Sequence, residues 1–532
     1  MSKHNIRVAS ATVLVCFFLC VGLIECTTQI PPKHDESCHS APRVAVIGGG
    51  IAGAATIRFL RTLLGDAAQL TLYERRHELG GRIRVIDTPN GGVLETGASV
   101  YHLSNRYLID FVEELGLQQR PDDGLNGERL GIWDGEQFLF ETSQYDAVTM
   151  LRGLWRYGLS SLTVQDMVSE VLDKFLRVYD LLEEEHFETP QALLRALDLY
   201  ELTQRSLQSL LTEEGISPLY AAELITGVNR VNYGQDNSLN ALVGLVSIIG
   251  NTDELASVSG GNPQIVSGLL NRSGASVELE RTVHRISLAD PTTATASQPP
   301  RYRVHSHESS LSAATFYTAD TDEPLRVEGN AERVDHFDAV VMAAPVELSR
   351  IAFDPPLNRH VDRTQRTYQV TYVTVLEARL KSSYFGLEPD DLPQLIMTTE
   401  NERIPFSSLM AWYRVSVRQP EETEQHPQEA GQQRTEEPQR GYKVFSRAPL
   451  SDQLLAQLFD NISWVHRSAF HAYPVLTPTP SMPTFRLHDG LFYVNALESA
   501  FSTMETEAIG ARNVASLVTD YLKCTSVCES SD

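Results

Sequence analysis

Residues 43–53 read R-V-A-V-I-G-G-G-I-A-G, and this stretch decides the fold. Residues 44–47 are apolar and partly β-branched, which predicts a short buried strand. Gly48, Gly50 and Gly53 follow with the spacing G-x-G-x-x-G, and residues 54–64 continue in a helical pattern. Such glycines permit a tight turn, close approach of the backbone to a diphosphate, and close packing of the helix on the strand. The backbone N–H groups and the positive end of the helix dipole would then face the phosphates.

A second apolar run ends in an acidic residue where dinucleotide binding requires one. Residues 69–72 predict a strand, and Glu74 follows them at roughly the spacing of 20 residues from the glycine turn that is typical of such sites. A carboxylate there can accept hydrogen bonds from both ribose hydroxyls of an adenosine. Together these features predict a Rossmann-like dinucleotide-binding unit, and the alternative is an ordinary glycine-rich turn.

Two further segments bear on which dinucleotide binds. Residues 75–82 have the pattern R-x-x-x-L-G-G-R, and residues 95–99 have the pattern E-x-G-A-S. This pair resembles the N-terminal signature of the superfamily of FAD-dependent amine oxidases and phytoene desaturases. The resemblance implies an FAD site in which Arg75, Gly81 and Arg82 contact the cofactor near its diphosphate and Ala98 and Ser99 approach the flavin ring. The alternative is a βαβ connection that binds NAD.

The first 26 residues predict a signal peptide rather than part of the fold. Lys3, His4 and Arg7 form a basic lead, and residues 8–24 contain no charged residue. A retained signal anchor is the alternative, because this apolar run is long for a signal peptide and slightly short for a membrane span. No later stretch is apolar enough to span a bilayer, so we expect a luminal or secreted protein without stable membrane insertion. The lysosome is the first expectation and secretion the second.

The composition and net charge indicate which classes of ligand the chain is unsuited to bind. The chain has 532 residues, enough for a large core in two interleaved domains, and its formal net charge of −25 argues against nucleic acids and anionic membrane surfaces. Asn271 and Asn461 begin glycosylation sequons, which matter only in the secretory pathway. Cys38, Cys524 and Cys528 remain after cleavage near residue 26, and a disulfide between Cys38 and the tail is one pairing open to them. The two tail cysteines have no histidine nearby, so no metal site is expected.

Residues 108–211 are mostly helical by pattern. Apolar residues recur with helical spacing over 108–115, 150–159, 164–184, 189–199 and 201–211. Aromatic residues interrupt these helices, at Trp155, Tyr157, Phe175, Tyr179, Phe187 and Tyr200. Each one alone is best explained as a core residue. In the superfamily named above, however, such a helical insertion holds the substrate cavity, and an apolar lining would suit a long apolar substrate.

The most distinctive sequence segments lie further along the chain. Residues 232–235 read N-Y-G-Q, residues 259–262 read S-G-G-N, and residues 266–270 read V-S-G-L-L. Residues 442–446 (Y-K-V-F-S), 471–474 (H-A-Y-P) and 487–495 (L-H-D-G-L-F-Y-V-N) continue the pattern. With residues 99–102, these segments resemble the prenylcysteine oxidase (prenylcysteine lyase) family from about residue 43 to residue 522. Two polar insertions depart from the resemblance, 289–333 and 419–441, and we expect both to be mobile surface loops.

The remaining FAD contacts are expected from the second half of the chain. Residues 278–286 predict one strand. By resemblance to related oxidases, Val283 in this strand would touch the adenine through its backbone. Residues 337–345 predict a buried strand beside the dinucleotide. By resemblance, Glu498, Thr503 and Met504 contact the cofactor, and the helix over 506–522 directs its N-terminus at the flavin, where its partial positive charge would stabilise the reduced anion. A plain helix cap is the alternative at residues 502–503.

These features predict an α/β fold, a Rossmann-like FAD-binding domain of the amine-oxidase type interleaved with an α+β substrate domain that contains a helical insertion. After the signal peptide (1–26), the FAD-binding domain takes 43–105, 260–288 with 334–350, and 486–523. The substrate domain takes 106–259 and 351–485, the second part including the polar loop, and 289–333 form the mobile insertion.

The resemblance implies a thioether oxidase. The sequence shows no Ser/His/Asp order, zinc spacing or P-loop, so the oxidative work would fall to non-covalently bound FAD. The implied substrate is farnesyl- or geranylgeranylcysteine, cleaved with O2 and water to cysteine, a prenyl aldehyde and hydrogen peroxide. His102 is a candidate for positioning water or transferring a proton, and Arg230 and Asn232 are candidates for holding the cysteine carboxylate and ammonium. Structural roles for all three, an amine or polyamine oxidase, and a non-catalytic secreted relative stay open, as does the oligomeric state.

Overall fold

A parallel sheet forms around strand β1 (Arg43–Ile47). Its strand order is β10-β2-β1-β14-β22-β21, and only the pair β21–β22 is antiparallel. The other strands are β10 (Ser276–Glu278), β2 (Gln69–Tyr73), β14 (Ala339–Met342), β22 (Leu491–Tyr493) and β21 (Arg486–His488). Apart from Arg43, the residues of strands β1 and β14 are apolar and buried, as in strands covered on both faces. The sheet therefore joins segments from the beginning, middle and end of the chain.

The computed structural model describes residues 41–89, 91–121, 129–249, 254–289, 302–309, 332–354, 356, 366–414 and 440–528. The predicted signal peptide and Cys38 lie outside these residues, as do most of the insertion at 289–333 and most of the polar loop at 419–441. Residues 302–308, inside the predicted insertion, form the ordered strand β12 (Tyr302–Glu308). No helix in the described part of the chain is both long and apolar enough to cross a bilayer.

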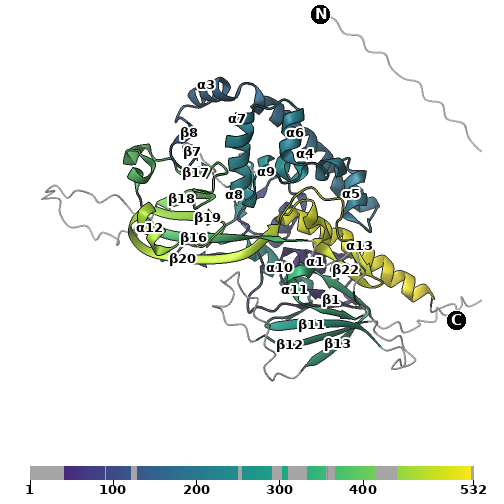
Figure 1. The fold of residues 1–532 in the computed structure, drawn as a ribbon. Coiled ribbons are helices and arrows are strands. Elements are labelled where there is room, and N and C mark those ends of the chain that lie inside the picture. The colour runs from purple at the N-terminus through teal and green to yellow at the C-terminus, as the bar shows by residue number, and fades with distance from the viewer. Residues whose placement is uncertain are drawn as a thin grey trace, which may run out of the picture. The chain divides into compact units, whose positions relative to one another are not determined.

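Helices cover one face of the parallel sheet and a second sheet lies on its other side (Figure 1). The helices are α1 (Ile51–Leu64), α10 (Pro263–Ser273) and α13 (Met504–Cys528). The second sheet has the order β13-β12-β11-β15, from β13 (Arg333–Phe337), β12, β11 (Arg281–Leu288) and β15 (Ala352–Asp354). These layers, with the other sheets and helices described below, confirm the predicted α/β class.

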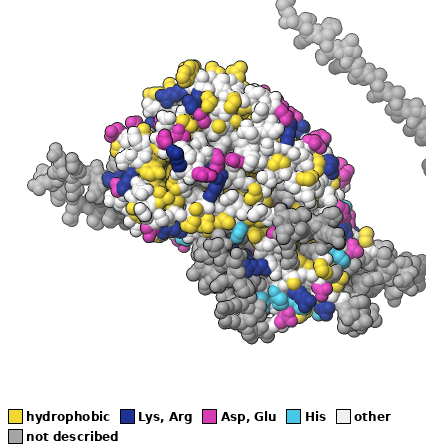
Figure 2. Space-filling view, in the orientation of Figure 1, with side chains coloured by type: hydrophobic (Ala, Val, Ile, Leu, Met, Phe, Trp, Pro, Cys, Tyr) yellow, Lys and Arg dark blue, Asp and Glu magenta, His cyan; other side chains and the backbone are white. Residues whose placement is uncertain are grey.

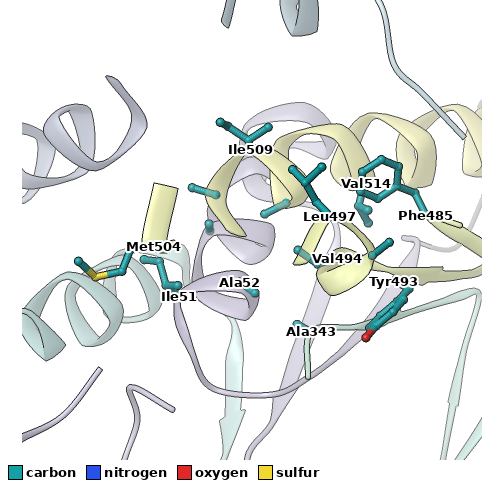
Figure 3. Packing of buried hydrophobic residues seen from close by; sticks show 14 of the residues in the cluster. Ile51, Ala52, Ala343, Phe485, Tyr493, Val494, Leu497, Met504, Ile509 and Val514 are labelled. Atoms are coloured by element: carbon teal, nitrogen blue, oxygen red, sulfur yellow. The ribbon is translucent and has the colours of Figure 1, made fainter. Parts of the chain in front are cut away.

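Part of the buried core lies where α1 meets α13. Figure 3 shows Ile51 and Ala52 of α1 with Ile509 and Val514 of α13, and with Leu497 of the 3-10 helix Val494–Ser499. All five side chains are buried. Their burial fixes the start of α13 beside the glycine turn that precedes α1.

A seven-stranded sheet has the order β20-β16-β19-β18-β17-β7-β8. Its strands are β20 (Phe459–Pro474), β16 (Tyr368–Leu380), β19 (Arg440–Ser446), β18 (Ser408–Arg414), β17 (Leu395–Thr398), β7 (Leu130–Trp133) and β8 (Phe138–Glu141). Only the pair β17–β7 is parallel. Two small sheets accompany it, β3 (Val85–Asp87) with β4 (Val93–Glu95), and β5 (Tyr101–His102), β9 (Leu255–Val258) and β6 (Gln119–Pro121).

Most of the predicted helical insertion is helical. The helices within or overlapping it are α2 (Arg106–Leu115), α3 (Asp146–Tyr157), α4 (Ser160–Glu184), α5 (Pro190–Ala196) and α6 (Leu207–Glu213). Beyond it follow α7 (Pro218–Tyr220), α8 (Thr226–Tyr233) and α9 (Ala241–Ile249), with a π-helix at Ala221–Ile225 between α7 and α8. Shorter helices lie elsewhere, α11 (Val346–Ser349) and α12 (Asp452–Leu458).

One helix and one strand that were predicted to be continuous are each interrupted in the structure. The single helix expected over 201–211 is a 3-10 turn (Tyr200–Thr203) followed by α6, because Ser206 adopts extended backbone and caps α6 by accepting a hydrogen bond from the Ser209 N–H. The single strand expected over 278–286 is divided between β10 and β11, which belong to different sheets. Glu280 causes that division, because its φ of 52° turns the chain out of the first strand.

Two glycine-to-alanine changes should affect stability in opposite directions, one at the contact between α1 and the glycine turn and one in an open position of α3. A Cβ at Gly53 would lie 2.0 Å from the Gly48 carbonyl oxygen, whereas a Cβ at Gly153 in α3 meets nothing within 4 Å. We expect Gly53→Ala to destabilise the fold by roughly 3 kcal/mol through overpacking against backbone. Gly153→Ala should instead stabilise by about 0.5–1 kcal/mol through helix propensity. Urea unfolding of both variants measures the difference, and an unchanged midpoint for Gly53→Ala would contradict the close packing.

Candidate active site

One cavity of about 1690 Å3 runs through the described part of the chain. Its walls include residues 47–52 around the glycine turn, residues 97–102 beyond β4, and residues 501–507 at the start of α13. Ile51 and Met504, from the first and last of these segments, belong to one buried cluster (Figure 3). The cavity is thus bounded by segments more than 400 residues apart in the chain.

The glycine turn leaves room for a ligand at the N-terminus of α1. Gly48 has a φ of 122°, and a Cβ there would lie 2.6 Å from the Ala343 carbonyl oxygen. Gly50 caps α1 without any side-chain hydrogen bond, so the backbone of the first turn borders the cavity directly. A helix N-terminus open in this way suits a diphosphate, because its N–H groups and dipole favour negative charge. Gly53 does not line the cavity and instead lets α1 pack against the turn.

Glu74 lies at the end of β2, on the cavity wall. Its carboxylate accepts hydrogen bonds from the backbone N–H groups of Gly49 (2.7 Å) and Arg76 (3.0 Å). Burial raises the pKa of Glu74 above its ordinary value, and the hydrogen bond from Gly49 opposes that shift. Arg75 and Val283 line the same part of the cavity. A buried carboxylate between the glycine turn and Val283 fits the ribose of an adenosine.

Arg82 lines the cavity and belongs to a cluster of charged side chains behind its wall. Its guanidinium donates to the Ala472 carbonyl oxygen (2.8 Å) and to the Glu498 carboxylate, and it lies 3.8 Å from Glu507. Burial acts to raise the pKa of Glu498, but the charge of Arg82 outweighs it and lowers that pKa to about 2. Burial and the charge of Glu498 raise the pKa of Glu507 well above its ordinary value. Glu498 therefore carries the charge that holds Arg82, and burial together with that charge disfavours a second charge on Glu507.

The structure places the predicted residues in two groups. Most of the predicted cofactor residues line the cavity: Gly48, Gly50, Glu74, Arg75, Gly81, Arg82, Ala98, Ser99, Val283, Thr503 and Met504. Gly53 and Glu498 lie behind its wall, the first in packing and the second against Arg82. Thr503 also caps α13, since its hydroxyl accepts a hydrogen bond from the Thr506 N–H (3.1 Å). The residues present thus fit a dinucleotide along the glycine turn, with its far end toward Ser99 and α13.

Lys443 of β19 is a cavity residue that was not predicted as part of the site. Its ammonium donates to the Ser99 hydroxyl (2.9 Å) and lies 4.9 Å from the centre of the Phe445 ring. The side chain is almost completely buried, which is rare for lysine. The signal in the sequence is a lysine inside the run 442–445, whose other residues are apolar or aromatic.

The candidate catalytic and substrate-binding residues all reach the cavity wall. His102 is buried, its Nδ1 accepts a hydrogen bond from the Ser104 N–H (3.0 Å), and its Nε2 lies 3.5 Å from the Glu254 carboxylate. Burial lowers the pKa of His102, so the neutral ring is favoured. Arg230 donates to the Thr398 hydroxyl (2.9 Å) and to the Glu400 carboxylate. Asn232 donates its side-chain amide to the Ser247 carbonyl oxygen (2.9 Å).

A large part of the cavity lining is apolar. This apolar part comes chiefly from α4 and from the π-helix and α8, namely Val164, Val168, Val171, Leu172, Phe175, Leu176, Leu224 and Val228. Of the aromatics expected in the core or the pocket, Phe175 lines the cavity. Tyr179 is buried and donates to Glu505 (2.7 Å). Trp155 is in neither place, because 88% of it is exposed.

Glu505 joins α13 to the helical insertion and predicts a pH-dependent stability. Its carboxylate accepts hydrogen bonds from the backbone N–H groups of Tyr107 (2.9 Å) and Leu108 (3.0 Å) in the first turn of α2. Burial raises its pKa from 4.5 to about 7, although these hydrogen bonds oppose the shift. Because the folded pKa is the higher one, the stabilisation is complete below pH 4.5 and is lost as the pH rises through 7.

We therefore expect wild-type stability to fall by roughly 3 kcal/mol more than that of Glu505→Gln between pH 4.5 and 7.5. Urea unfolding across this range measures the slope, and Glu214→Gln at an exposed glutamate serves as the matched control. Equal slopes for wild type and Glu505→Gln would contradict the assignment.

Comparison with known proteins agrees with this geometry. The chain is 32% identical over 515 residues to prenylcysteine oxidase 1 of Homo sapiens, a match that covers 95% of this chain and 94% of that protein. It is 31% identical over 498 residues to farnesylcysteine lyase of Arabidopsis thaliana, covering 90% and 88% of the two chains. A family model described as an NAD(P)-binding Rossmann-like domain matches residues 46–115.

Solved structures confirm the fold. Cyclohexylamine oxidase from Brevibacterium oxydans IH-35A has a TM-score of 0.55 at 15% identity, covering 91% of this chain and all of its own. Wild-type putrescine oxidase bound to putrescine has a TM-score of 0.52 at 15% identity, covering 90% and 99%. At such identities the likeness shows the amine-oxidase fold alone. The model of the prenylcysteine lyase family, in contrast, matches residues 140–529, and with the two relatives above it shows that this chain belongs to the prenylcysteine lyase family.

Proposed function

We propose that this chain is an FAD-dependent oxidase that cleaves the thioether of farnesyl- or geranylgeranylcysteine. The balanced reaction takes one prenylcysteine, one O2 and one water to free cysteine, a prenyl aldehyde and hydrogen peroxide. The carbon–sulfur bond at the allylic carbon breaks, that carbon is oxidised to the aldehyde, and O2 is reduced to peroxide. Such a reaction would serve the breakdown of prenylated proteins.

The observation that carries the proposal is the continuity of the cavity. One space joins the glycine turn and Glu74 to the apolar walls of α4 and α8. A dinucleotide fits the first half, and a long hydrocarbon chain fits the second, where each buried methylene contributes about 0.8 kcal/mol. The part that suits the dinucleotide and the part that suits the hydrocarbon chain would meet near Ser99, Lys443 and the start of α13. The bond to be oxidised would lie against the cofactor there.

FAD supplies the two-electron oxidation when bound. The chain holds the substrate in an apolar channel that excludes water from the prenyl group. Lys443 keeps a buried positive charge against Ser99 on the segment beside the cofactor. His102, neutral and on the cavity wall, is our candidate for placing the water that the reaction consumes.

The charge of the cavity walls argues against the alternative of a polyamine oxidase. Although the whole chain has a net charge of −25, the described residues of the cavity wall include nine cations (Arg75, Arg76, Arg82, Arg120, Arg230, Arg281, Arg350, Lys443 and Arg447). They include only four carboxylates (Glu74, Glu347, Glu505 and Glu507), each of them hydrogen-bonded within the protein. Such walls suit the phosphates of a cofactor and a substrate carboxylate, and they repel a polycation.

Ligand roles for Arg230 and Asn232 toward the substrate carboxylate and ammonium stay predictions. In the structure, Arg230 joins α8 to the end of β17 through Thr398 and to the nearby Glu400. Asn232 joins α8 to α9 through Ser247. These contacts also fit the structural alternative for both residues.

The compartment is part of the proposal too. The basic and apolar character of residues 1–26 supports passage into the secretory pathway, with the lysosome as the expected destination and secretion as the alternative. The sequon asparagines Asn271 and Asn461 lie in the described part of the chain, the first near the end of α10 and the second in β20.

The function is tested by supplying purified, FAD-loaded protein with farnesylcysteine in air. We expect one hydrogen peroxide and one free thiol for each substrate consumed, and no peroxide from putrescine or spermine. A peroxidase-coupled assay and thiol titration measure the two products. Turnover of the amines without turnover of farnesylcysteine would contradict the proposal, and so would protein that cannot be loaded with FAD.

The role of His102 is tested by His102→Ala, with His336→Ala at an exposed histidine of β13 as the matched control. Loss of a group that places water should lower kcat on farnesylcysteine roughly 100-fold while the bound FAD spectrum stays unchanged. Because burial lowers the pKa of His102, wild-type activity should fall as the pH drops below 6.5, and the variant should lack that fall. Normal turnover by His102→Ala would remove the residue from the mechanism.

A further inference from the structure

Helix α3 exposes an unusual set of large apolar side chains. Seven such residues lie between positions 145 and 162, with exposed fractions of 49–88%: Tyr145, Met150, Leu151, Leu154, Trp155, Leu159 and Leu162. Figure 2 shows hydrophobic side chains gathered on the part of the surface where Figure 1 places α3. Contiguous apolar surface of this kind marks an interaction site, whereas single exposed apolar residues do not.

The helix has its apolar side turned outward. Met150, Leu151, Leu154 and Trp155 recur with i, i+1, i+4, i+5 spacing on the exposed face, whereas Val148, Thr149, Arg156 and Tyr157 face inward. An ordinary surface helix of a globular domain has the opposite arrangement. The helix is long enough for three turns, so this face is a continuous stripe.

Polar contacts hold α3 in this orientation. Arg156 pairs with both carboxylate oxygens of Glu223 in the π-helix (2.7 and 2.6 Å), and the Tyr157 hydroxyl donates to the same carboxylate (2.9 Å). The Tyr157 ring packs on Tyr220, with ring centres 5.3 Å apart. Because a paired, partly buried arginine and a buried tyrosine anchor the inner face, the apolar face cannot turn inward without breaking them.

The exposed stripe lies beside the apolar half of the cavity. At the start of α4, Leu159 and Leu162 face solvent, whereas Ser161, Val164 and Gln165 line the cavity. Tyr220, which packs on Tyr157, is also a cavity residue. The apolar surface and the apolar channel are therefore separated by about one turn of helix.

The charge of the stripe differs from that of the rest of the chain. Residues 143–165 contain one acidic residue, Asp146, and two basic residues, Arg152 and Arg156, in a chain with 69 acidic and 44 basic residues. Arg152 is exposed beside Leu151, where a long basic side chain can reach a lipid phosphate while its stem lies on apolar groups. Tyr145 and Trp155 supply the amphipathic rings that favour the level of lipid headgroups.

We propose that the face formed by α3 and the start of α4 docks on the surface of a lipid bilayer and holds the apolar part of the cavity close to the lipid. The protein would lie on the bilayer without spanning it, with the stripe immersed among headgroups and upper acyl chains. The choice of a bilayer rests on the proposed function, since a prenylated cysteine dissolves in lipid and would reach the channel without crossing water. It also rests on the local scarcity of acidic residues, which removes the repulsion that the rest of the surface would exert.

The test is flotation of the FAD-loaded protein with phosphatidylcholine vesicles. The variant Leu151→Gln/Trp155→Gln changes two exposed residues, and Leu63→Gln/Leu279→Gln changes two exposed leucines of the FAD-binding layers as the matched control. We expect wild type and the control to float, and the floated fraction of the α3 variant to fall about fivefold or more. Brominated phosphatidylcholine should quench wild-type fluorescence, and Trp155→Phe should keep flotation while losing most of that quenching.

Flotation needs no turnover, so it separates this proposal from the proposed function. Failure of wild type to float, equal flotation of the α3 variant, or quenching unchanged in Trp155→Phe would overturn docking through α3. Concentration-dependent self-association that the α3 substitutions abolish, without flotation of wild type, would overturn it in favour of a second copy of this chain. Flotation by a protein that does not oxidise farnesylcysteine would support the docking surface while contradicting the reaction.

Discussion

The structure depends on the close packing of α1 on the glycine turn that precedes it. Gly53 has no side chain, so the helix can approach within a distance that a single methyl group would block. That approach sets the direction of α1 and opens its N-terminus to the cavity. The same helix packs against α13, which brings a segment from the end of the chain to the same place (Figure 3). The cofactor half of the cavity follows from these two contacts.

The distribution of charge around the cavity cannot be inferred from the net charge of the whole chain. Cations outnumber carboxylates on its walls, although the chain as a whole is strongly acidic. Arg82 is balanced by Glu498, while burial and the charge of Glu498 raise the pKa of Glu507 and so disfavour a second buried negative charge. Lys443 adds a buried cation next to Ser99. These groups suit anionic ligands at one end and leave the other end to hydrocarbon.

Much of the cofactor site could be predicted from sequence because it depends on local patterns. The spacing of Gly48, Gly50 and Gly53 and the position of Glu74 are fixed by one βαβ unit, so a short stretch contains the whole signal. Lys443 and Glu505 were missed, as cavity residue and as cap of α2, because each acts on a segment hundreds of residues away. The breaks at Ser206 and Glu280 were missed because single backbone conformations override an otherwise continuous apolar pattern. Trp155 fits a core helix by spacing, and only the tertiary structure shows that its face is turned to solvent.

The central claim is that one cavity brings a prenyl thioether to a bound flavin. Anaerobic mixing of the purified flavoprotein with farnesylcysteine tests it most directly, because it isolates electron transfer from the later reaction with oxygen. The account predicts that a stoichiometric amount of farnesylcysteine bleaches the visible absorbance of the oxidised flavin, and that admitting air restores it. A flavin that keeps its absorbance with farnesylcysteine but loses it with an amine would contradict the account.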